Sequence, residues 1–360
     1  MFTKIVTFVG KGTRGTIGDG LPRTEAYLSG PAGLAYDPVE NALLVAEIGS
    51  NRIRSVSLDG GLEPGSGDRG RVKTLLGTGE PGHSPSGVPA AACLLNGPEA
   101  VEVDVSGDVY VADSKNNVVR RLNRSGLRGR VGTVDVVAGT GEQGRGSPGG
   151  PGSGVALSEP CGVRSDSRGD VYIVDYRNHR VLILDAEGML NLYAGTGEPG
   201  FSVDGTPASK SAIGGPHGMA VDAADDIYIV DNWNHRIRKV SRDTGAMTTV
   251  AGSGGYGFGG DGGAATGALL SGPRDFSGIH AVCAGEGLIF IADSGNDRVR
   301  MVNRVGTIST IAGTGRRGYS GDGGDPLLAD ISGPHGIIRL PGGEVLFNEY
   351  LNHTVRALLP

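Results

Sequence analysis

Short apolar runs with polar residues at alternating positions recur along the whole chain, and glycine-rich segments separate them. The run VYIVDYRNHRVLIL (171–184), for example, joins two apolar stretches through an acid, a short turn and an asparagine. Runs of this length, bounded by Gly, Pro, Asn and Asp, are typical of β-strands. Although 66 of the 360 residues are glycine and 19 are proline, the glycines fall between the apolar runs, which indicates an ordered, turn-rich, all-β protein.

One unit recurs six times. Each copy contains a strand that ends in an acid, a short turn with Asn, and a basic-apolar strand; the copies span 43–56, 109–122, 171–184, 227–240, 289–302 and 345–358. A strand opened by Gly and Pro precedes each copy, and a fourth strand such as TTVAGSG or STIAGTG follows the third. Four short antiparallel strands repeated six times predict a six-bladed β-propeller that forms a single domain over residues 1–360.

The two ends of the chain fit together in this scheme. The chain stops after the third strand of its sixth unit, and its first segment, KIVTFVGKGTRGTIGDG, matches the fourth-strand segment STIAGTGRRGYSGDG. We therefore expect the N-terminal strand to complete the last blade and so to remove the exposed edges of an open array. The phrases VDNWNHRIRKV and AGTGRRGYSGDGG resemble NHL repeats, and the resemblance covers essentially the whole chain. It implies the fold and leaves the function open, because NHL propellers include enzymes, protein-binding modules and RNA-binding modules.

Residues shared by the copies are expected to build the scaffold. The acid that ends each strand should accept hydrogen bonds from turn amides; these acids are Glu47, Asp113, Asp175, Asp231, Asp293 and Glu349. Basic residues of the following strands alternate with apolar residues, which predicts a strand with one water-facing side; examples are Arg52, Arg54, Arg236, Arg238 and Lys239. Aspartates in the glycine turns are interpreted as turn residues, because they lack the ligand series of a calcium-binding loop; they are Asp19, Asp204, Asp261 and Asp322.

The composition restricts the partners and the cellular location that we expect for the protein. A formal net charge of −6 gives no reason to expect nucleic acid or an anionic membrane as a partner. No apolar run approaches the length of a membrane span, and the segment MFTKIVTFVG lacks the hydrophobic region and cleavage site of a secretory signal. The cysteines Cys93, Cys161 and Cys283 are odd in number and have no CxxC spacing. We expect a cytoplasmic protein without a disulfide framework.

Function is expected where the copies differ. The residue after the opening proline is Ala32, Glu99, Cys161, His217, Arg274 or His335 in the successive blades. Because the first strand of a propeller blade is innermost, these residues should surround the mouth of the central channel. Glu99, His217 and His335 each lie fourteen residues before a strand-end acid, in alternate blades, and should point at one spot. Two imidazoles and a carboxylate predict a site for a divalent metal, zinc first, with iron or manganese also suitable. The alternative is a set of separate polar residues that line a wet channel.

The fifth blade departs from the spacing of the others. It carries about five extra residues before Asp293, and His280 comes into the ring if the hairpin after its strand is one residue shorter. His280 is then a fourth ligand, a general base or an ordinary strand histidine. Arg274 is expected at the rim, where its planar guanidinium could bind an anionic substrate group. Cys161 is either a nucleophile in the ring or, more simply, a small filler.

Aromatic residues follow three of the strand-end acids. Tyr176, Trp233 and Tyr350 lie in turns on the face of the channel mouth. Aromatic side chains around a polar centre suit a ligand pocket, although each could instead cover its neighbouring blade.

The Pro-His motifs also resemble a narrower group, the peptidyl-α-hydroxyglycine α-amidating lyases. That family holds zinc with histidines from Pro-His motifs on alternate blades of a six-bladed NHL-type propeller. His217 and His335 match two of these motifs, Glu99 stands where the third would be, and Tyr176 falls in the interval that holds the base of the family. The family's secretory signal, paired cysteines and arginine have no counterpart here. The resemblance implies a metal centre in the pore and does not extend to the substrate.

Together these features predict a metal-dependent lyase or hydrolase that acts on a small or peptide-like substrate at the channel mouth. Tyr176 or His280 would move the proton. Two alternatives remain. One is a non-enzymatic NHL propeller that grips a protein or glycan with its rim loops. The other is a calcium-dependent lactonase of the gluconolactonase type, against which the two ring histidines argue, because calcium prefers oxygen ligands.

Overall fold

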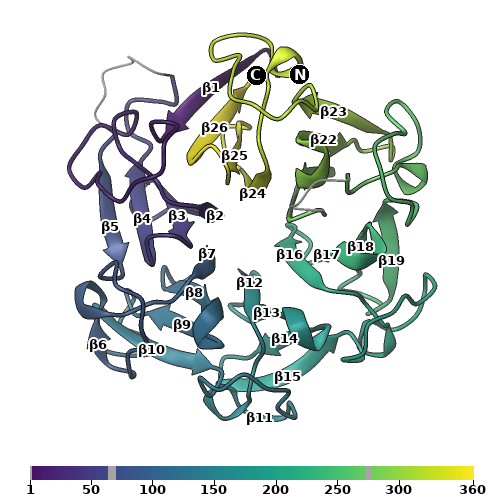
Figure 1. The fold of residues 1–360 in the computed structure, drawn as a ribbon. Helices are drawn as coiled ribbons and strands as arrows, with labels where there is room; N and C mark the ends of the chain where they lie inside the picture. The colour runs from purple at the N-terminus through teal and green to yellow at the C-terminus, as the bar shows by residue number, and fades with distance from the viewer. Residues whose placement is uncertain (1, 64–69, 273–277) are drawn as a thin grey trace.

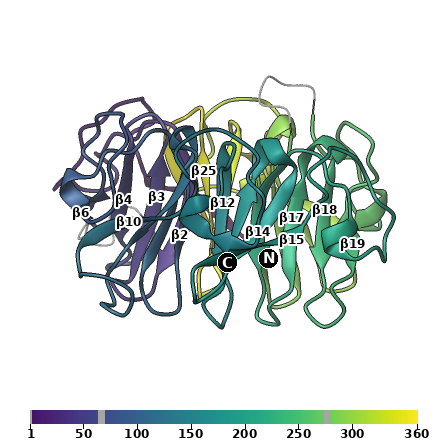
Figure 2. The same ribbon diagram turned by 90° about the horizontal axis from the view of Figure 1, so that it is seen from below.

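Six antiparallel sheets surround a central axis in the computed structural model, which describes residues 2–63, 70–272 and 278–360. The ring of sheets is seen end-on in Figure 1. The side view shows the blades standing side by side, with loops at both faces of the ring (Figure 2). The six-bladed β-propeller predicted from the repeats is confirmed. Within the described residues, no helix is long and apolar enough to cross a membrane.

The first three blades each contain four main strands in sequence order. Blade 1 consists of β2 (Pro31–Asp37), β3 (Ala42–Glu47), β4 (Arg52–Ser57) and β5 (Val72–Leu76). Blade 2 consists of β7 (Pro98–Val103), β8 (Val109–Asp113), β9 (Val118–Leu122) and β10 (Thr133–Ala138), with the short β6 (Val88–Pro89) at its outer edge. Blade 3 consists of β12 (Pro160–Ser165), β13 (Val171–Asp175), β14 (Arg180–Leu184) and β15 (Met189–Ala194), with β11 (Gly150–Pro151) at its outer edge.

The other three blades have four strands each. Blade 4 consists of β16 (Pro216–Val221), β17 (Ile227–Asp231), β18 (Arg236–Val240) and β19 (Met247–Ala251). Blade 5 consists of β20 (Ala281–Gly285), β21 (Leu288–Asp293), β22 (Arg298–Val302) and β23 (Ile308–Ala312). Blade 6 consists of β24 (Pro334–Arg339), β25 (Val345–Glu349), β26 (Thr354–Leu359) and β1 (Lys4–Val9).

Short 3-10 helices lie in the connections. Those that follow the second strand of a blade are η2 (Ser114–Asn116), η4 (Tyr176–Asn178), η6 (Asn232–Asn234) and η8 (Ser294–Asn296). Those between blades are η1 (Ala90–Ala92), η3 (Gly152–Gly154), η5 (Ala208–Lys210), η7 (Ala265–Gly267) and η9 (Pro326–Leu328).

The N-terminal strand closes the ring. β1 pairs with β26 in an antiparallel ladder that runs from Lys4 opposite Leu359 to Val9 opposite Val355. The two termini therefore lie close together at blade 6 (Figure 1). Buried apolar residues of β1, among them Ile5 and Phe8, add to the cores between blade 6 and its neighbours. The predicted completion of the last blade by the N-terminal strand is confirmed.

In five blades a buried arginine of the third strand pairs with the acid that ends the second strand. The arginines lie seven residues after the strand-end acids and have fully buried side chains; they are Arg54, Arg120, Arg238, Arg300 and Arg356. In blade 2, for example, Arg120 Nε lies 2.7 Å from Asp113 Oδ2, and both side chains have no exposed surface. Blade 3 carries Leu182 at this position, and Arg180 Nε bonds the acid instead, 2.8 Å from Asp175 Oδ2.

These pairs correct the prediction of a water-facing row of basic residues, which is wrong for Arg54 and Arg238. Both side chains are buried because each strand of a propeller blade is covered by the neighbouring blade or by the connection that crosses it. In four blades the aspartate of a glycine turn supplies the second anion. Arg54 Nη2 lies 2.6 Å from Asp19, and Arg300 Nη2 lies 2.6 Å from Asp261; Arg238 and Arg356 pair in the same way with Asp204 and Asp322.

Deleting residues 1–10 should cause a large loss of thermal stability or aggregation, because the deletion exposes the edge of β26 and opens the core between blades 6 and 1. Thermal unfolding followed by circular dichroism measures the loss. Removal of the exposed residue Pro360 is the matched control. A truncated protein that melts like the full chain would contradict closure by β1.

Replacing Arg120 with methionine should lower the free energy of unfolding by about 3–5 kcal/mol, because it leaves the Asp113 carboxylate buried without its cation. Urea unfolding measures the change. The exposed turn residue Lys115 provides the control, since Lys115→Met should change stability by less than about 0.5 kcal/mol. Equal effects of the two substitutions would show that the buried pair contributes nothing special.

Candidate metal centre

The strand-end acids fix the position of the residues that face the central channel. In blade 4, Asp231 Oδ1 accepts a hydrogen bond of 2.7 Å from the backbone N–H of Gly214, three residues before His217. The corresponding acids of blades 1, 2, 3 and 6 accept the N–H groups of Ser29, Asn96, Ser158 and Ser332, each again three residues before the channel-facing residue. The predicted pairing of the acids with turn amides is confirmed, and it holds these channel-facing residues at one height.

In blade 5, His280 lies at the same height, although the spacing of this blade differs from that of the others. Ala281 pairs with Ala292, the residue before the strand-end acid, just as Gly162 pairs with Val174 in blade 3. His280 therefore occupies the register position of Cys161. The hairpin between β20 and β21 is a tight turn, because Gly285 pairs directly with Leu288. We call the resulting set the ring positions: Ala32, Glu99, Cys161, His217, His280 and His335.

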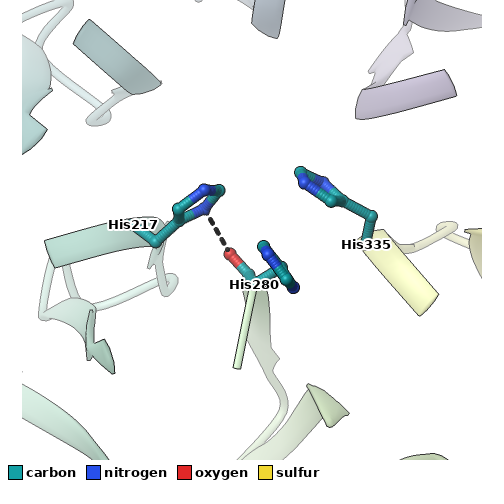
Figure 3. Close-up of side chains that lie close together, drawn as sticks. All are labelled: His217, His280 and His335. Carbon is teal, nitrogen blue, oxygen red and sulfur yellow. Dashed lines mark hydrogen bonds between the residues drawn. The ribbon is translucent and has the colours of Figure 1, made fainter. Parts of the chain in front are cut away.

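Three histidines meet at the channel axis. One nitrogen from each of His217, His280 and His335 lies within 4.8 Å of the others, and the three side chains point toward one another from three blades (Figure 3). The His280 and His335 rings stack at a centroid distance of 4.3 Å and an angle of 22°. The His217 ring lies 5.4 Å from the His335 ring. Glu99 joins them from blade 2, with its Oε1 atom 3.2 Å from His217 Nε2.

Backbone carbonyls orient these side chains. His217 Nδ1 lies 3.1 Å from the carbonyl oxygen of His280, the ring residue of the next blade. Because a carbonyl oxygen only accepts, Nδ1 donates this hydrogen bond, which leaves Nε2 to face Glu99 or a metal ion, as in metal-binding histidines. The Ala32 backbone lies beside His335 and partly opposes the lowering of its pKa, and Cys161 Sγ lies 3.4 Å from the His217 carbonyl.

Glycines make this support possible. A Cβ atom on Gly218 would clash with the His280 carbonyl oxygen, and one on Gly336 would clash with that of Ala32. The residue after each of these histidines must therefore lack a side chain for the neighbouring inner strand to approach. The Pro-His-Gly motif combines a fixed strand entry, a ligand and a close backbone contact.

Burial favours the neutral form of two of the imidazoles, those of His280 and His335. Burial lowers the pKa of His335 to about 4, and the neighbouring His217 adds to the effect. Burial also lowers the pKa of His280 well below its usual range, assisted by its two histidine neighbours. Burial alone would raise the pKa of Glu99, but the hydrogen bond and charge of His217 outweigh it and lower the pKa overall. At neutral pH His280 and His335 therefore offer nitrogen lone pairs, and Glu99 carries a negative charge.

This donor set fits a transition metal. Two ligand atoms that each lie about 2.1 Å from a tetrahedral zinc ion are about 3.4 Å apart, close to the 3.2 Å between Glu99 Oε1 and His217 Nε2. His280 Nδ1 is buried and has no hydrogen-bond partner among the described residues. The trio can therefore hold a metal, and three imidazoles suit zinc, iron or manganese better than calcium.

The other predicted site residues lie at different distances from the trio. The Tyr176 ring lies edge-on to His217 at 5.9 Å, and the Tyr350 ring lies 5.7 Å from His335. Trp233 is farther out: it is 49% exposed, and its ring packs against His179 of blade 3 at 4.8 Å. Trp233 thus covers the neighbouring blade as well as facing the rim. Arg274 lies outside the described residues.

Cys161 packs as a buried thiol. Its exposed fraction is 5%, and burial, with the nearby Glu99 carboxylate, raises its pKa well above the usual range. A thiol that stays protonated is a poor nucleophile, so the structure favours the filler interpretation.

Sequence reasoning missed two charged residues deeper in the channel. Arg164 on β12 and Glu102 on β7 lie beyond the ring positions, with Arg164 Nη1 3.5 Å from Glu102 Oε2. Arg164 lines the small cavity of about 30 Å³ that also touches Glu99 and all three histidines. The available signal was a charged residue within inner strands that are otherwise mostly small or apolar.

Comparison with known proteins agrees with this architecture. The NHL repeat model matches residues 157–184 and 214–240, so the chain is a six-bladed β-propeller with NHL repeats. It is 28% identical over 293 residues to the protein SUPPRESSOR OF QUENCHING 1, chloroplastic, of Arabidopsis thaliana, covering 78% of this chain and 25% of that protein. It is 25% identical over 314 residues to the human NHL repeat-containing protein 2, covering 79% of this chain and 40% of that protein. The chain thus spans less than half the length of these relatives.

Solved structures share the fold at low sequence identity. A Bacteroides thetaiotaomicron protein of unknown function superposes with a TM-score of 0.66 at 16% identity, over 99% of this chain and 75% of that one. A gluconolactonase from Xanthomonas campestris gives a TM-score of 0.56 at 13% identity, over 92% and 87% of the two chains. A streptogramin B lyase gives 0.52 at 14% identity, over 99% and 97%.

The metal-free protein should lose stability as the pH falls from about 6.5 toward about 4. The His335 pKa is about 4 in the folded state and about 6.5 when unfolded. Between these values the unfolded chain binds the extra proton and the folded chain does not, so acid favours unfolding. Urea unfolding after chelation should give roughly 1–2 kcal/mol less stability at pH 5 than at pH 7. His335→Gln should reduce this difference; an unchanged difference would refute the assignment.

Proposed function

We propose that the chain is a metal-dependent lyase or hydrolase that acts on a small-molecule substrate within its channel. The observation that carries the proposal is the convergence of three histidine nitrogens within 4.8 Å of one another at the axis. In a scaffold with no use for a ligand, two polar imidazoles with strongly lowered pKa values would be costly to bury together. Perturbed titratable groups gathered in a channel are typical of functional sites.

The residues of the site divide into ligands and a proton carrier. His217, His280 and His335 would hold the metal, with zinc as the preferred ion, and Glu99 would complete the set with its one negative charge. A divalent metal bound there would act as a Lewis acid toward a substrate oxygen. His280 is then a ligand rather than the general base that the sequence left open.

Tyr176 is the remaining candidate for proton transfer. Its ring contacts His217 edge-on at 5.9 Å, so its side chain lies beside one of the proposed ligands. A phenol in this position can give or take a proton when the substrate bond breaks. Tyr350 lies beside His335 in a similar way, with its ring at 5.7 Å.

The ligand atoms of the site help to distinguish between the alternative functions. A calcium-dependent lactonase needs a site rich in oxygen ligands, whereas the trio offers nitrogen. The shared fold with a gluconolactonase, at 13% identity, therefore does not carry its chemistry to this chain. A purely protein-binding or glycan-binding propeller would have no need of a stoichiometric metal at the axis, which makes metal content the decisive measurement.

The full chain, purified without a histidine tag, should contain or take up about one transition-metal ion per molecule. Elemental analysis after incubation with zinc, iron or manganese and removal of excess metal measures the stoichiometry. His217→Ala and His335→Ala should each lose most of the metal, and the double variant should lose little more, because ligands of one ion act as a unit. Glu99→Gln should weaken binding and keep the fold.

His83 provides the matched control, because it lies in an outer connection rather than at a ring position. His83→Ala should retain the full metal content. Additive, independent effects at His217 and His335, or a wild-type chain that takes up no metal, would refute the shared site and favour a binding module.

A further inference from the structure

The channel continues beyond the histidine trio into a second, larger cavity. The small cavity at the ring positions and a wider one of about 260 Å³ are both lined by Leu34 and Arg164, so they adjoin along the axis. The wider cavity is bounded by the far ends of the inner strands and contains Arg339 from β24. From these features we infer that Arg164 binds the carboxylate of a small hydroxy- or oxo-carboxylate whose other polar group faces the trio. The inference rests on the proposed function and specifies its substrate class.

The guanidinium of Arg164 still has hydrogen-bond donors with which it can bind a ligand. Its Nη1 atom bonds the backbone carbonyls of Val163 at 2.8 Å and Val101 at 3.3 Å. Among the described residues, none accepts a hydrogen bond from its Nε or Nη2 atoms. Arg164 is 18% exposed, and this exposed part faces a cavity rather than the outer surface. The planar edge of an arginine matches the two oxygens of a carboxylate.

The neighbouring acid does not fully neutralise Arg164. The carboxylate of Glu102 approaches Arg164 Nη1 only to 3.5 Å, and its Oε1 atom is occupied by the N–H and hydroxyl of Ser165 at 3.3 and 3.1 Å. Burial raises the pKa of Glu102, although Arg164 opposes the effect. A single negative charge on the ligand is therefore favoured, since a phosphate dianion would also meet the Glu102 carboxylate at close range.

The size of the two cavities and the route into them further restrict which ligands can bind. The small cavity of about 30 Å³ at the trio admits only a few atoms, so the part of the ligand that reaches the histidines must be small. Arg339 borders the wider cavity and pairs with Glu286, which is 59% exposed, so this ion pair can open at little cost. The substrate would enter from the Arg339 side, opposite the turns that carry Tyr176 and Trp233.

Calorimetric titration of the zinc-loaded full chain tests the inference, with glycolate as the probe and glycolamide as its neutral counterpart. Glycolate should bind at least tenfold more tightly than glycolamide. Arg164→Met should weaken glycolate binding at least tenfold and leave the zinc content and melting temperature unchanged. Arg164→Lys should restore part of the binding, which keeps the test valid if the methionine variant folds poorly.

Arg177→Met is the matched control, because Arg177 is 54% exposed on the opposite face; it should bind glycolate normally. Equal affinity for glycolate and glycolamide, a loss in the Arg177 variant instead of the Arg164 variants, or no glycolate binding to a zinc-replete chain would each overturn the inference while leaving the metal site intact. If the chain takes up no zinc and still binds glycolate through Arg164, the carboxylate site stands and the proposed function fails.

Discussion

Burying a carboxylate at the end of the second strand of every blade is the constraint on which the rest of the molecule depends. Such a group must be neutralised and hydrogen-bonded inside the protein. The arginine of the third strand supplies the charge in five blades, and the arginine two residues earlier supplies it in blade 3. The second carboxylate oxygen is then free to accept the amide that enters the inner strand. One buried ion thus ties three successive segments of each blade together.

The buried acids also determine the height at which the ring positions lie in the channel. Because the amide bound by the acid lies three residues before the ring position, histidines on separate blades arrive at the same height. Blade 5 has lost that spacing: Ser271 keeps the contact with Asp293, and His280 follows nine residues later. The short hairpin between β20 and β21 restores the register. Scaffold and site are therefore linked through the backbone of the inner strands.

Repetition explains how much the sequence could predict. Six copies of one pattern determine the fold and its closure by β1, and constant spacing places Glu99, His217 and His335 around the axis. Alternation along one strand could not reveal that Arg54 and Arg238 are buried, since the covering segment comes from a distant connection. The pairing of Glu99 with His217, the close stacking of His280 on His335, and Arg164 beneath them depend on side-chain directions between blades, which spacing alone does not contain.

Backbone carbonyls of the next blade support the ring side chains of Cys161 and His217, and this has an evolutionary consequence. A carbonyl is present whatever residue carries it, so exchanging one ring residue leaves the hydrogen bond to its predecessor in place. Ala32, which has no polar side chain, still places its backbone carbonyl against Gly336, next to His335. Single substitutions can therefore change the side chains at the ring positions, while the arrangement of the inner strands stays the same. Propellers of closely similar sequence can therefore carry different ring residues and bind different ligands in the central channel.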